Sequence, residues 1–288
     1  MSVTSLALLR EWVCRQSPEH AHWLAEQYAL LSQVGNEKDL HLFLGLVVRR
    51  VGKQDLTLTS QDLAMANQTY PGWNPDGWSL DGAARVAALL AFKGSRPFSA
   101  TFQDLVRTAD ARELITLYRG LALYPRPESL TFEVGEGLRS NMRAVFESIV
   151  HRNPYPRDHF DDHRWNHMVL KALFVGSRLS PIVGFDDRAN LELARILLDY
   201  AQERWAAGRE VSPELWRCVG PFAEQVSAYG ALQRALSGTP IERGAATLAL
   251  IAADTSSARD LLQTVPDITA LVADGRLDWN HLPLKEAA

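Results

Sequence analysis

Apolar residues recur at intervals of three and four along most of the chain. The spacing is clear at Leu6, Leu9 and Val13, and it returns over residues 40–48. This period places apolar side chains on one face of an α-helix. Alternation of apolar and polar residues, which is typical of a strand, is confined to residues 56–59 and is too short to build a sheet. The pattern therefore predicts an all-α fold of stacked short helices.

Hydroxyl residues mark where several of these helices begin. Ser17, Thr59, Ser212 and Thr239 each precede an amphipathic segment, and three of the four are followed directly by proline. A hydroxyl side chain can cap the first free N–H groups of a helix, and proline suits the first helical position. We expect helix starts at these four residues.

Two turn-rich segments interrupt the helical rhythm. Residues 69–82 hold prolines, glycines and two tryptophans, Trp73 and Trp78, which we expect to anchor this loop on the core because aromatic side chains bury large areas. Residues 124–137 form a second interruption. We therefore divide the chain into an N-terminal helical part, residues 1–124, and a second part, residues 125–288, with one continuous domain as the alternative.

The C-terminal third is the most repetitive part of the chain. Residues 221–277 alternate short helical segments with turns, and alanine dominates the positions expected to be buried. Small residues allow helices to approach closely, and the segment lengths suit stacked helical pairs. The pattern predicts an α-solenoid of HEAT-like type, with a plain helical bundle as the alternative.

Composition excludes several classes of protein. Thirty basic residues against 34 acidic ones give a formal charge of −4, and no basic run exceeds Arg49-Arg50, which argues against nucleic acid as a partner. Two cysteines are too few for a disulfide framework or a thiolate zinc site. The first residues lack a positive leader, and residues 40–48 are too few to span a bilayer, so we expect a cytoplasmic protein without a transmembrane segment. The oligomeric state is left open.

Residues 151–174, HRNPYPRDHFDDHRWNHMVLKALF, gather four of the eight histidines. The two prolines disfavour helix before them, which predicts a helix start near Asp158. Histidines then recur every fourth residue, through His163 and His167 to Lys171, with a drift of about 40° per step around the helix. Such a pair can chelate a metal, yet no H-E-x-x-H pattern is present and Lys171 shares the edge. We favour a solvated polar edge, and we expect no cofactor.

The rest of this predicted helix is apolar on nearly every side. Asn166 and Lys171 should therefore lie in or beside a core. A buried ammonium group needs a partner, because desolvation disfavours its charge. A structural ion pair is the simpler interpretation for Lys171, and a ligand-facing lysine at the floor of a pocket is the alternative.

A second polar theme follows in residues 186–209, which we expect to form one long helix. Its charges alternate at steps of three and four residues, as in a solvated ladder, although such a stripe between apolar faces can also line a polar groove. The stripe consists of Arg188, Glu192, Arg195, Asp199 and Glu203. Arg139 and Asn141 also enter an apolar segment.

Several strings in the middle of the chain resemble the EboA family. They are GWNPDGW (72–78), AAR (83–85), LRSN (138–141), NPYP (153–156), WNHMVLKALF (165–174), RANLELAR (188–195), ERWAAGR (203–209) and ELWR (214–217). The resemblance implies a helical, cytoplasmic, bacterial protein encoded with a small metabolic gene cluster. The neighbours there include a UbiA-type prenyltransferase and a dehydroquinate-synthase-like enzyme, and such clusters are linked to making or moving a secondary-metabolite precursor.

The resemblance changes the choice of candidate residues. The family string commonly has a glutamine-like residue where His167 stands, so the histidine pair is no part of a shared chemistry. The candidate ligand-binding residues are Arg139, Asn141, Tyr155, Asn166, Lys171, Arg188, Asn190, Arg195, Glu203, Arg204 and Trp205. His163 and His167 are the minor candidates for a metal.

Three hypotheses follow from these residues. The leading one is an accessory protein of a secondary-metabolite cluster that binds a polar precursor, or a partner enzyme, in a groove between the helices near Asp158 and Asp186. The second is an enzyme acting on a sugar- or cyclitol-like substrate, with a metal at the histidine pair. The third is an architectural solenoid whose polar stripe faces water.

Overall fold

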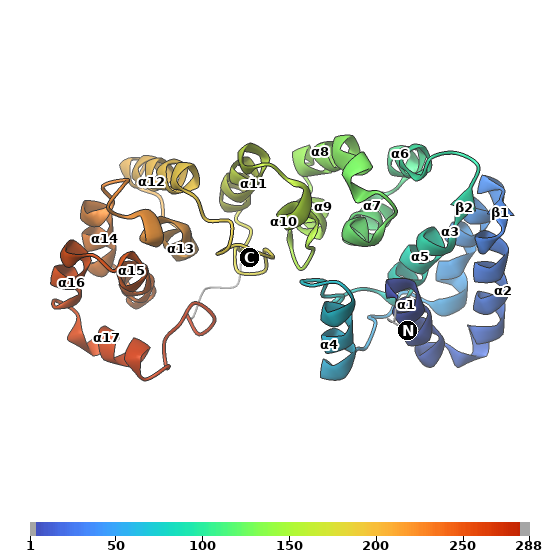
Figure 1. Cartoon of the computed structure of the whole chain (residues 1–288), viewed down its shortest axis with the longest axis horizontal. Helices are drawn as coiled ribbons and strands as arrows, with labels where there is room; N and C mark the ends of the chain where they lie inside the picture. Colours follow the sequence, from blue (N-terminus) through green and yellow to red (C-terminus); the bar gives the residue numbers. More distant parts are fainter. Residues whose placement is uncertain (1–3, 283–288) are drawn as a thin grey trace. The chain divides into compact units, whose positions relative to one another are not determined.

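The computed structural model describes residues 4–282, and over this range the chain forms seventeen α-helices joined by turns (Figure 1). The chain divides into two compact units, Met1–His159 and Phe160–Ala288. The predicted all-α class is confirmed. The expected division after residue 124 and the solenoid interpretation stay predictions. No helix within residues 4–282 is long and apolar enough to cross a membrane.

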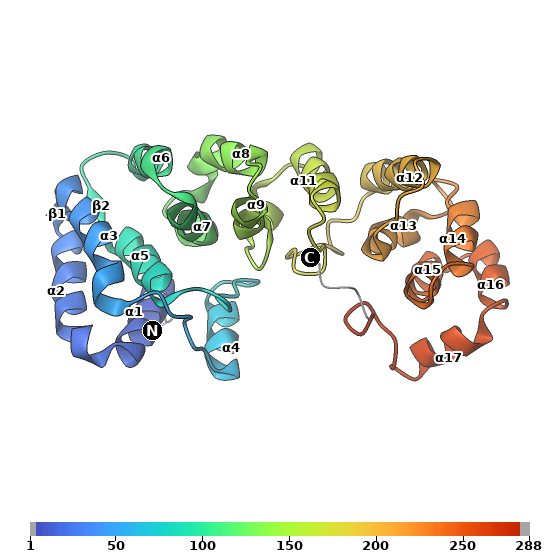
Figure 2. The ribbon, with the colours of Figure 1, turned by 180° about the vertical axis from the view of Figure 1, so that it is seen from behind.

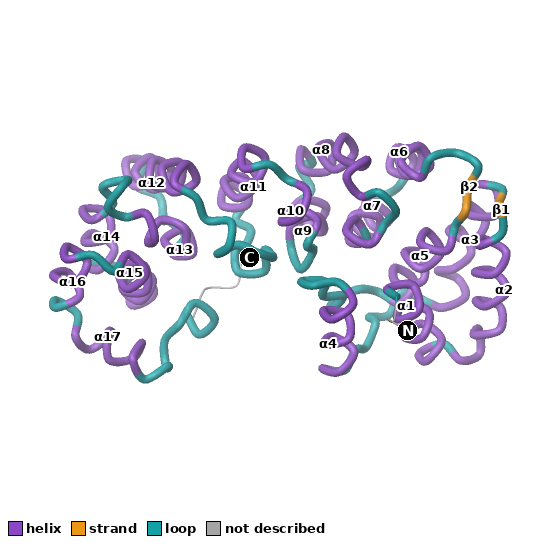
Figure 3. Tube along the Cα trace, in the orientation of Figure 1, coloured by secondary structure: helices purple, strands orange, loops and turns teal. Residues whose placement is uncertain are grey.

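The first unit contains ten helices. They are α1 (Ser5–Gln16), α2 (Ala21–Ser32), α3 (Glu37–Val51), α4 (Ser60–Thr69), α5 (Leu80–Ala91), α6 (Phe98–Thr108), α7 (Ala111–Arg119), α8 (Thr131–Arg139), α9 (Arg143–Val150) and α10 (Tyr155–His159). Two strands of two residues each, β1 (Val34–Gly35) and β2 (Lys93–Gly94), pair in parallel and are drawn in orange in Figure 3. This pair joins two loops and forms no layer of its own.

Helix α5 is the centre of the first unit. It contacts α1, α2, α3 and α7, and every residue from Leu80 to Leu89 is buried. The sequence of α5, LDGAARVAALLA, is rich in alanine and glycine, so neighbouring helices can approach its backbone from several sides. Figure 2 shows these neighbours from behind. The loop before α5 is anchored as expected, because Trp73 and Trp78 are buried and their rings lie 6.3 Å apart.

The second unit contains seven helices, and they too surround a helix that is rich in small residues. They are α11 (Asp162–Phe174), α12 (Leu191–Ala206), α13 (Trp216–Val219), α14 (Tyr229–Leu236), α15 (Pro240–Ala253), α16 (Ser256–Leu262) and α17 (Pro266–Ala273). Helix α15 contacts α13, α14, α16 and α17, and its small residues from Gly244 to Leu250 are buried. A small-residue helix therefore organises each unit.

Two helix starts differ from the predictions. The helix expected from Asp158 is broken, because α10 ends at His159 and Asp161 caps α11 by accepting a hydrogen bond from the Arg164 N–H at 2.7 Å. The helix expected over residues 186–209 begins at Leu191, where the side chain of Asn190 is the cap. A local side-chain cap decides each start, and periodicity does not show which of several polar residues provides it.

The predicted hydroxyl caps are partly confirmed. Thr59 and Thr239 form capping boxes at α4 and α15. Ser17 and Ser212 instead precede short 3-10 turns, η1 (Pro18–His20) and η4 (Pro213–Leu215), without a side-chain cap. Phe174 also differs from the expected burial of this apolar segment, because its side chain is 80% exposed at the end of α11.

Candidate functional site

Asn166 and Asn190 form a reciprocal amide pair between α11 and the start of α12. Asn190 Nδ2 donates to Asn166 Oδ1 at 2.9 Å, and Asn166 Nδ2 donates to Asn190 Oδ1 at 3.2 Å. Asn190 Oδ1 also accepts the Leu193 N–H at 2.9 Å, which caps α12. Asn166 is buried, as the sequence predicted. Its amide holds two elements together.

Arg188 lies in the loop before α12 and ties that loop to the start of α11. Its guanidinium donates to the Phe160 carbonyl oxygen and to Asp162 Oδ1, both at 2.7 Å. It also lies 4.7 Å from the centre of the Trp165 ring, a cation–π distance. Arg188 is thus held by three contacts within the second unit.

The histidines and Lys171 lie on the outer part of α11. His163 and His167 are exposed, with ring centres 4.4 Å apart. Residues 4–282 contain no group of three or more His, Cys, Asp or Glu side chains that could hold a metal ion. Lys171 is half-buried, and burial lowers the pKa of its ammonium group.

The charged stripe of α12 faces water. Glu192, Arg195, Asp199 and Glu203 are all exposed, and Arg195 pairs with Glu192 at 3.5 Å. This exposure agrees with a row of solvated charges and not with the wall of a groove.

Arg204 and Trp205 differ from that stripe. Trp205 is half-buried on the same helix. The Trp205 ring lies 5.8 Å from the Trp216 ring, and the Arg234 guanidinium lies 4.3 Å above it. Arg204 Nε donates to the Glu210 carbonyl oxygen at 2.9 Å. Trp205 therefore packs against the core of the unit, whereas Arg204 faces the pocket described below.

The remaining candidates belong to the first unit. Arg139 and Asn141 are exposed, and Arg139 pairs with Glu136 one helical turn earlier. Tyr155 is fully buried, and its hydroxyl donates to the Pro127 carbonyl oxygen at 3.1 Å. None of these three residues lines the pocket that contains Arg204.

A pocket of about 540 Å³ lies beside the C-terminal half of α12, and we call it the α12 pocket. Small-molecule sites in proteins usually enclose about 300–1,000 Å³, so this volume suits a metabolite. The pocket is bounded by the end of α11, by α12, by the loop that leads to η4 and by the first turn of α15. Its lining residues are Leu173, Gly176, Ser177, Arg178, Tyr200, Arg204, Glu210, Val211, Ser212, Pro213, Glu214, Thr239, Pro240, Ile241 and Glu242.

Two of the three carboxylates in this lining are already used by the fold. Glu214 is buried and accepts the backbone N–H groups of Leu179 and Ser180, both at 2.9 Å. Glu242 accepts the Thr239 N–H at 2.8 Å in the α15 capping box. Neither carboxylate forms an ion pair with Arg204 among residues 4–282, whereas Arg178 lies 3.9 Å from Glu214.

Arg204 is the clearest hydrogen-bond donor in the α12 pocket. Only its Nε has a hydrogen-bond partner among residues 4–282, which leaves both Nη groups free to donate. A guanidinium group recognises carboxylate and phosphate oxygens well. The arrangement can therefore bind a small molecule that combines an apolar body with oxygen acceptors.

Arg204 is the one residue of this pocket that the sequence indicated as a ligand-binding candidate. Ser212 and Thr239 were expected only as helix starts, and Arg178 was not expected in a site. The opposite wall comes from Ile241 and its neighbours, which are far away in the sequence. Glu214 could have been noticed in the sequence, because it follows Ser212-Pro213 directly and precedes the apolar residues Leu215 and Trp216.

Comparison with known proteins adds one match. A family model described as "Metabolite traffic protein EboA" matches residues 5–220, which is three quarters of the 288 residues. No curated protein and no solved structure matches the chain. The match includes α11, α12 and Arg204, and it ends before the wall contributed by α15.

Proposed function

The chain belongs to the EboA family of metabolite traffic proteins, and from this premise we propose that it binds a small metabolite in the α12 pocket and hands it on unchanged. In this role it is an accessory protein of a secondary-metabolite pathway. The observation that carries the proposal is Arg204, whose two free Nη groups face a pocket of metabolite size.

The chemistry of the lining supports a particular class of ligand. Leu173, Val211 and Ile241 offer apolar surface, and Arg204 offers a cationic hydrogen-bond donor. A ligand with a hydrocarbon part and a carboxylate, phosphate or several hydroxyl groups satisfies both. Pockets of this kind fix a ligand by a few polar contacts and bind it through apolar burial.

The proposal replaces the groove near Asp158 and Asp186 with the α12 pocket. Asn166, Asn190 and Arg188 are engaged in contacts within the fold, and Arg195 faces water. Any direct role of these residues in binding stays a prediction. The enzymatic alternative gains no support from the exposed histidine pair.

A cellular experiment tests the proposal with a matched pair of variants. Arg204→Met removes the donor of the pocket, and Arg195→Met removes an arginine from the exposed face of the same helix. In a strain that makes the pathway metabolite, we expect Arg204→Met to reproduce the metabolite profile of the deletion strain, and Arg195→Met to keep the wild-type profile. Metabolites are quantified by liquid chromatography and mass spectrometry.

The amount of each variant in the cell is measured alongside, because loss of folding also removes function. A wild-type profile from Arg204→Met at normal protein level contradicts the proposal. A deletion-like profile from Arg195→Met would instead move the site to the exposed stripe.

A further inference from the structure

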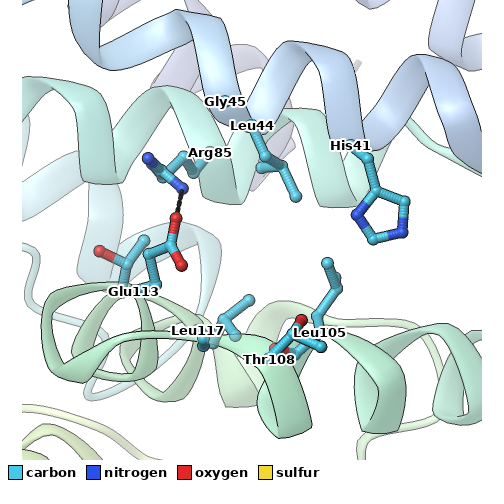
Figure 4. A pocket seen from close by; sticks show the side chains of 10 residues that line it. His41, Leu44, Gly45, Arg85, Leu105, Thr108, Glu113 and Leu117 are labelled. Carbon is cyan, nitrogen blue, oxygen red and sulfur yellow. Dashed lines mark hydrogen bonds and ion pairs between the residues drawn. The ribbon is translucent and has the colours of Figure 1, made fainter.

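A second hollow lies in the first unit, where α3, α5, α6 and α7 meet. Two adjoining cavities of about 160 and 230 Å³ share Gly45, Arg85, Glu113 and Thr116 in their linings. We call the combined hollow the Arg85 cleft. Figure 4 shows Leu44 on one side with Leu105 and Leu117 facing it, and Arg85 joined to Glu113 at one end.

Arg85 is an unusual residue in its helix. All of its neighbours from Leu80 to Leu89 are buried, and Arg85 itself is only 8% exposed. Its Nη1 donates to Glu113 at 3.0 Å, while its Nε lies 3.6 Å from Asp81, beyond hydrogen-bond distance. Buried polar groups usually have a hydrogen-bond partner. The enclosed Nε–H of Arg85 has none and approaches the Asp81 carboxylate only to 3.6 Å, so the guanidinium beside the cleft is incompletely satisfied within the fold.

Gly45 leaves the cleft open from the side of α3. Glycine in the interior of a helix costs about 1 kcal/mol relative to alanine, so a reason for it is expected. Packing gives none, because a Cβ at Gly45 would have no heavy atom within 4 Å. His41, Leu44 and Arg49 line the cleft from the same face of α3. Gly45 is exposed, so a side chain added there would enter the space beside α3 that the cleft occupies.

The two cavities of the cleft differ in chemistry. The smaller one is mixed, because the leucines Leu44, Leu105 and Leu117 share its lining with polar side chains. These polar residues are His41, Arg85, Thr108, Glu113 and Thr116. The larger one is polar, and its charged residues are four cations, Arg49, Lys53, Arg85 and Arg112, and three anions, Asp81, Asp110 and Glu113.

Two of the four cations are available to a ligand. Arg49 and Lys53 form no ion pair within residues 4–282, whereas Arg112 donates to the buried Asp81 at 2.9 Å. The exposed cations therefore give the polar cavity a net attraction for anions.

We propose that the Arg85 cleft is a second ligand site, which takes a small organic anion with a short hydrocarbon chain. The carboxylate or phosphate head lies near Arg85, Arg49 and Lys53, and the chain lies between Leu44, Leu105 and Leu117. This site is independent of the α12 pocket, because the two belong to different units.

Calorimetric titration of the full chain with hexyl phosphate and hexanoate tests the proposal, with hexanol as the neutral analogue. We expect the anions to bind the wild type at least about tenfold more tightly than hexanol. Gly45→Leu adds a side chain to the lining that both cavities share, and it should weaken anion binding about tenfold or more. The affinities for hexyl phosphate and hexanoate show which head group the cleft prefers.

Matched control variants show whether a loss of binding comes from the cleft itself or from the kind of substitution. Gly230→Leu changes another exposed helical glycine with open space at its Cβ, and it should leave binding unchanged. Arg49→Gln combined with Lys53→Gln should weaken the binding of the anions but not of hexanol, while Lys38→Gln on the same helix should change neither.

No heat from either anion at millimolar concentration, unchanged affinity in Gly45→Leu, or equal affinity for hexanol would overturn the proposal. The α12 pocket also offers an arginine and apolar surface, so the titrations are repeated in an Ile241→Trp background, in which that pocket is filled. Binding that remains in this background and is weakened by Gly45→Leu belongs to the cleft. Loss of all hexyl phosphate binding in this background would assign the anion to the α12 pocket and would also overturn the site proposed for the cleft.

Discussion

At the scale of single residues, Asn166 and Asn190 show how a polar pair can be structural. Each amide donates to the oxygen of the other, and Asn190 also caps α12. Leaving a buried amide without its hydrogen-bond partner costs about 1–3 kcal/mol of folding stability. The pair therefore fixes the approach of α11 to the first turn of α12.

A double-mutant cycle tests this pairing. Asn166→Ala and Asn190→Ala should each destabilise the chain by about 1–3 kcal/mol, and Asn190→Ala should cost more because it also removes a helix cap. Urea denaturation of both single variants and the double variant should show a coupling of about 0.5 kcal/mol or more. Asn190→Asp keeps the cap at Leu193 but replaces the amide donor by a carboxylate oxygen that faces the Asn166 and Arg188 oxygens, so it tests the donor separately from the cap. Strictly additive losses would contradict the pairing.

Asp62 is a second residue with a structural charge. It is buried at the start of α4, accepts two hydrogen bonds from Arg15 of α1 at 2.6 and 3.1 Å, and completes a capping box with Thr59. The guanidinium and these hydrogen bonds hold the pKa of the Asp62 carboxyl well below its ordinary value of 3.8. Its contribution to stability is present at neutral pH, because the carboxylate is charged in both states there.

The pH dependence of Asp62→Asn follows from that direction. The variant should lose about 1–3 kcal/mol at pH 7. As the pH falls below 3.8, the unfolded carboxyl binds a proton while the folded one stays charged, so the advantage of the wild type should shrink. Thermal unfolding from pH 7 down to about 3 measures this difference. Asp260→Asn, on the exposed surface of α16, is the control. A constant difference over this range would refute the assignment.

Some residues could not have been placed from the sequence. Phe174 continues the apolar run of α11, yet it is 80% exposed because the helix ends there and no element of the described residues covers its ring. Arg85 had a usable signal, since Asp81 and Arg85 are the charged residues of an otherwise apolar helix and stand four positions apart. Burial of both residues is the consequence that sequence analysis missed.

At the scale of elements, the two small-residue helices determine the packing of their units. Helix α15 is approached so closely that a Cβ at Gly220 would lie 2.6 Å from the Ala249 carbonyl oxygen and 2.8 Å from its Cα. These are backbone atoms, which cannot rotate away. The glycine is therefore required by the contact between α15 and the 3-10 turn η5 (Gly220–Phe222).

Alanine at these glycines tests the close contact. Gly220→Ala should cost about 1–3 kcal/mol, the usual penalty of overpacking. Gly230→Ala adds the same methyl group to α14 in open space, and it should leave stability unchanged or raise it by up to about 1 kcal/mol. Chemical denaturation compares the two. Equal changes in the free energy of unfolding would show that α15 and η5 can move apart without loss of stability.

Helix existence followed from the sequence more readily than helix ends did. The period of three and four residues gave the all-α class, and the capping boxes at Thr59 and Thr239 confirmed two starts. The breaks at Asp161 and Asn190 depended on which polar side chain reached a free backbone N–H group. That choice depends on the fold around the residue and is not visible in the local pattern.

At the scale of the whole molecule, the net charge does not favour the binding of an anion, so binding depends on the charges close to each site. The chain carries a formal charge of −4, so an anion gains nothing from the net charge and must be attracted by nearby arginines. Arg204 provides such attraction in the α12 pocket. The family match ends at residue 220, so the wall formed by Ile241 lies outside the matched part.

Neither the α12 pocket nor the Arg85 cleft could be read from the sequence alone. The α12 pocket joins residues from 173 to 242, and no short motif connects Arg204 with Ile241. The family resemblance did indicate a metabolite, and the family match supports that part of the prediction. The position of the pocket required the fold.

Native mass spectrometry of the chain purified from its own host shows whether a metabolite occupies the α12 pocket. We expect a bound small molecule on the wild type and on Ile251→Trp, a variant at an exposed position of α15. Ile241→Trp fills the pocket from the same helix and should lose that molecule. A molecule retained equally by Ile241→Trp would show that it binds elsewhere.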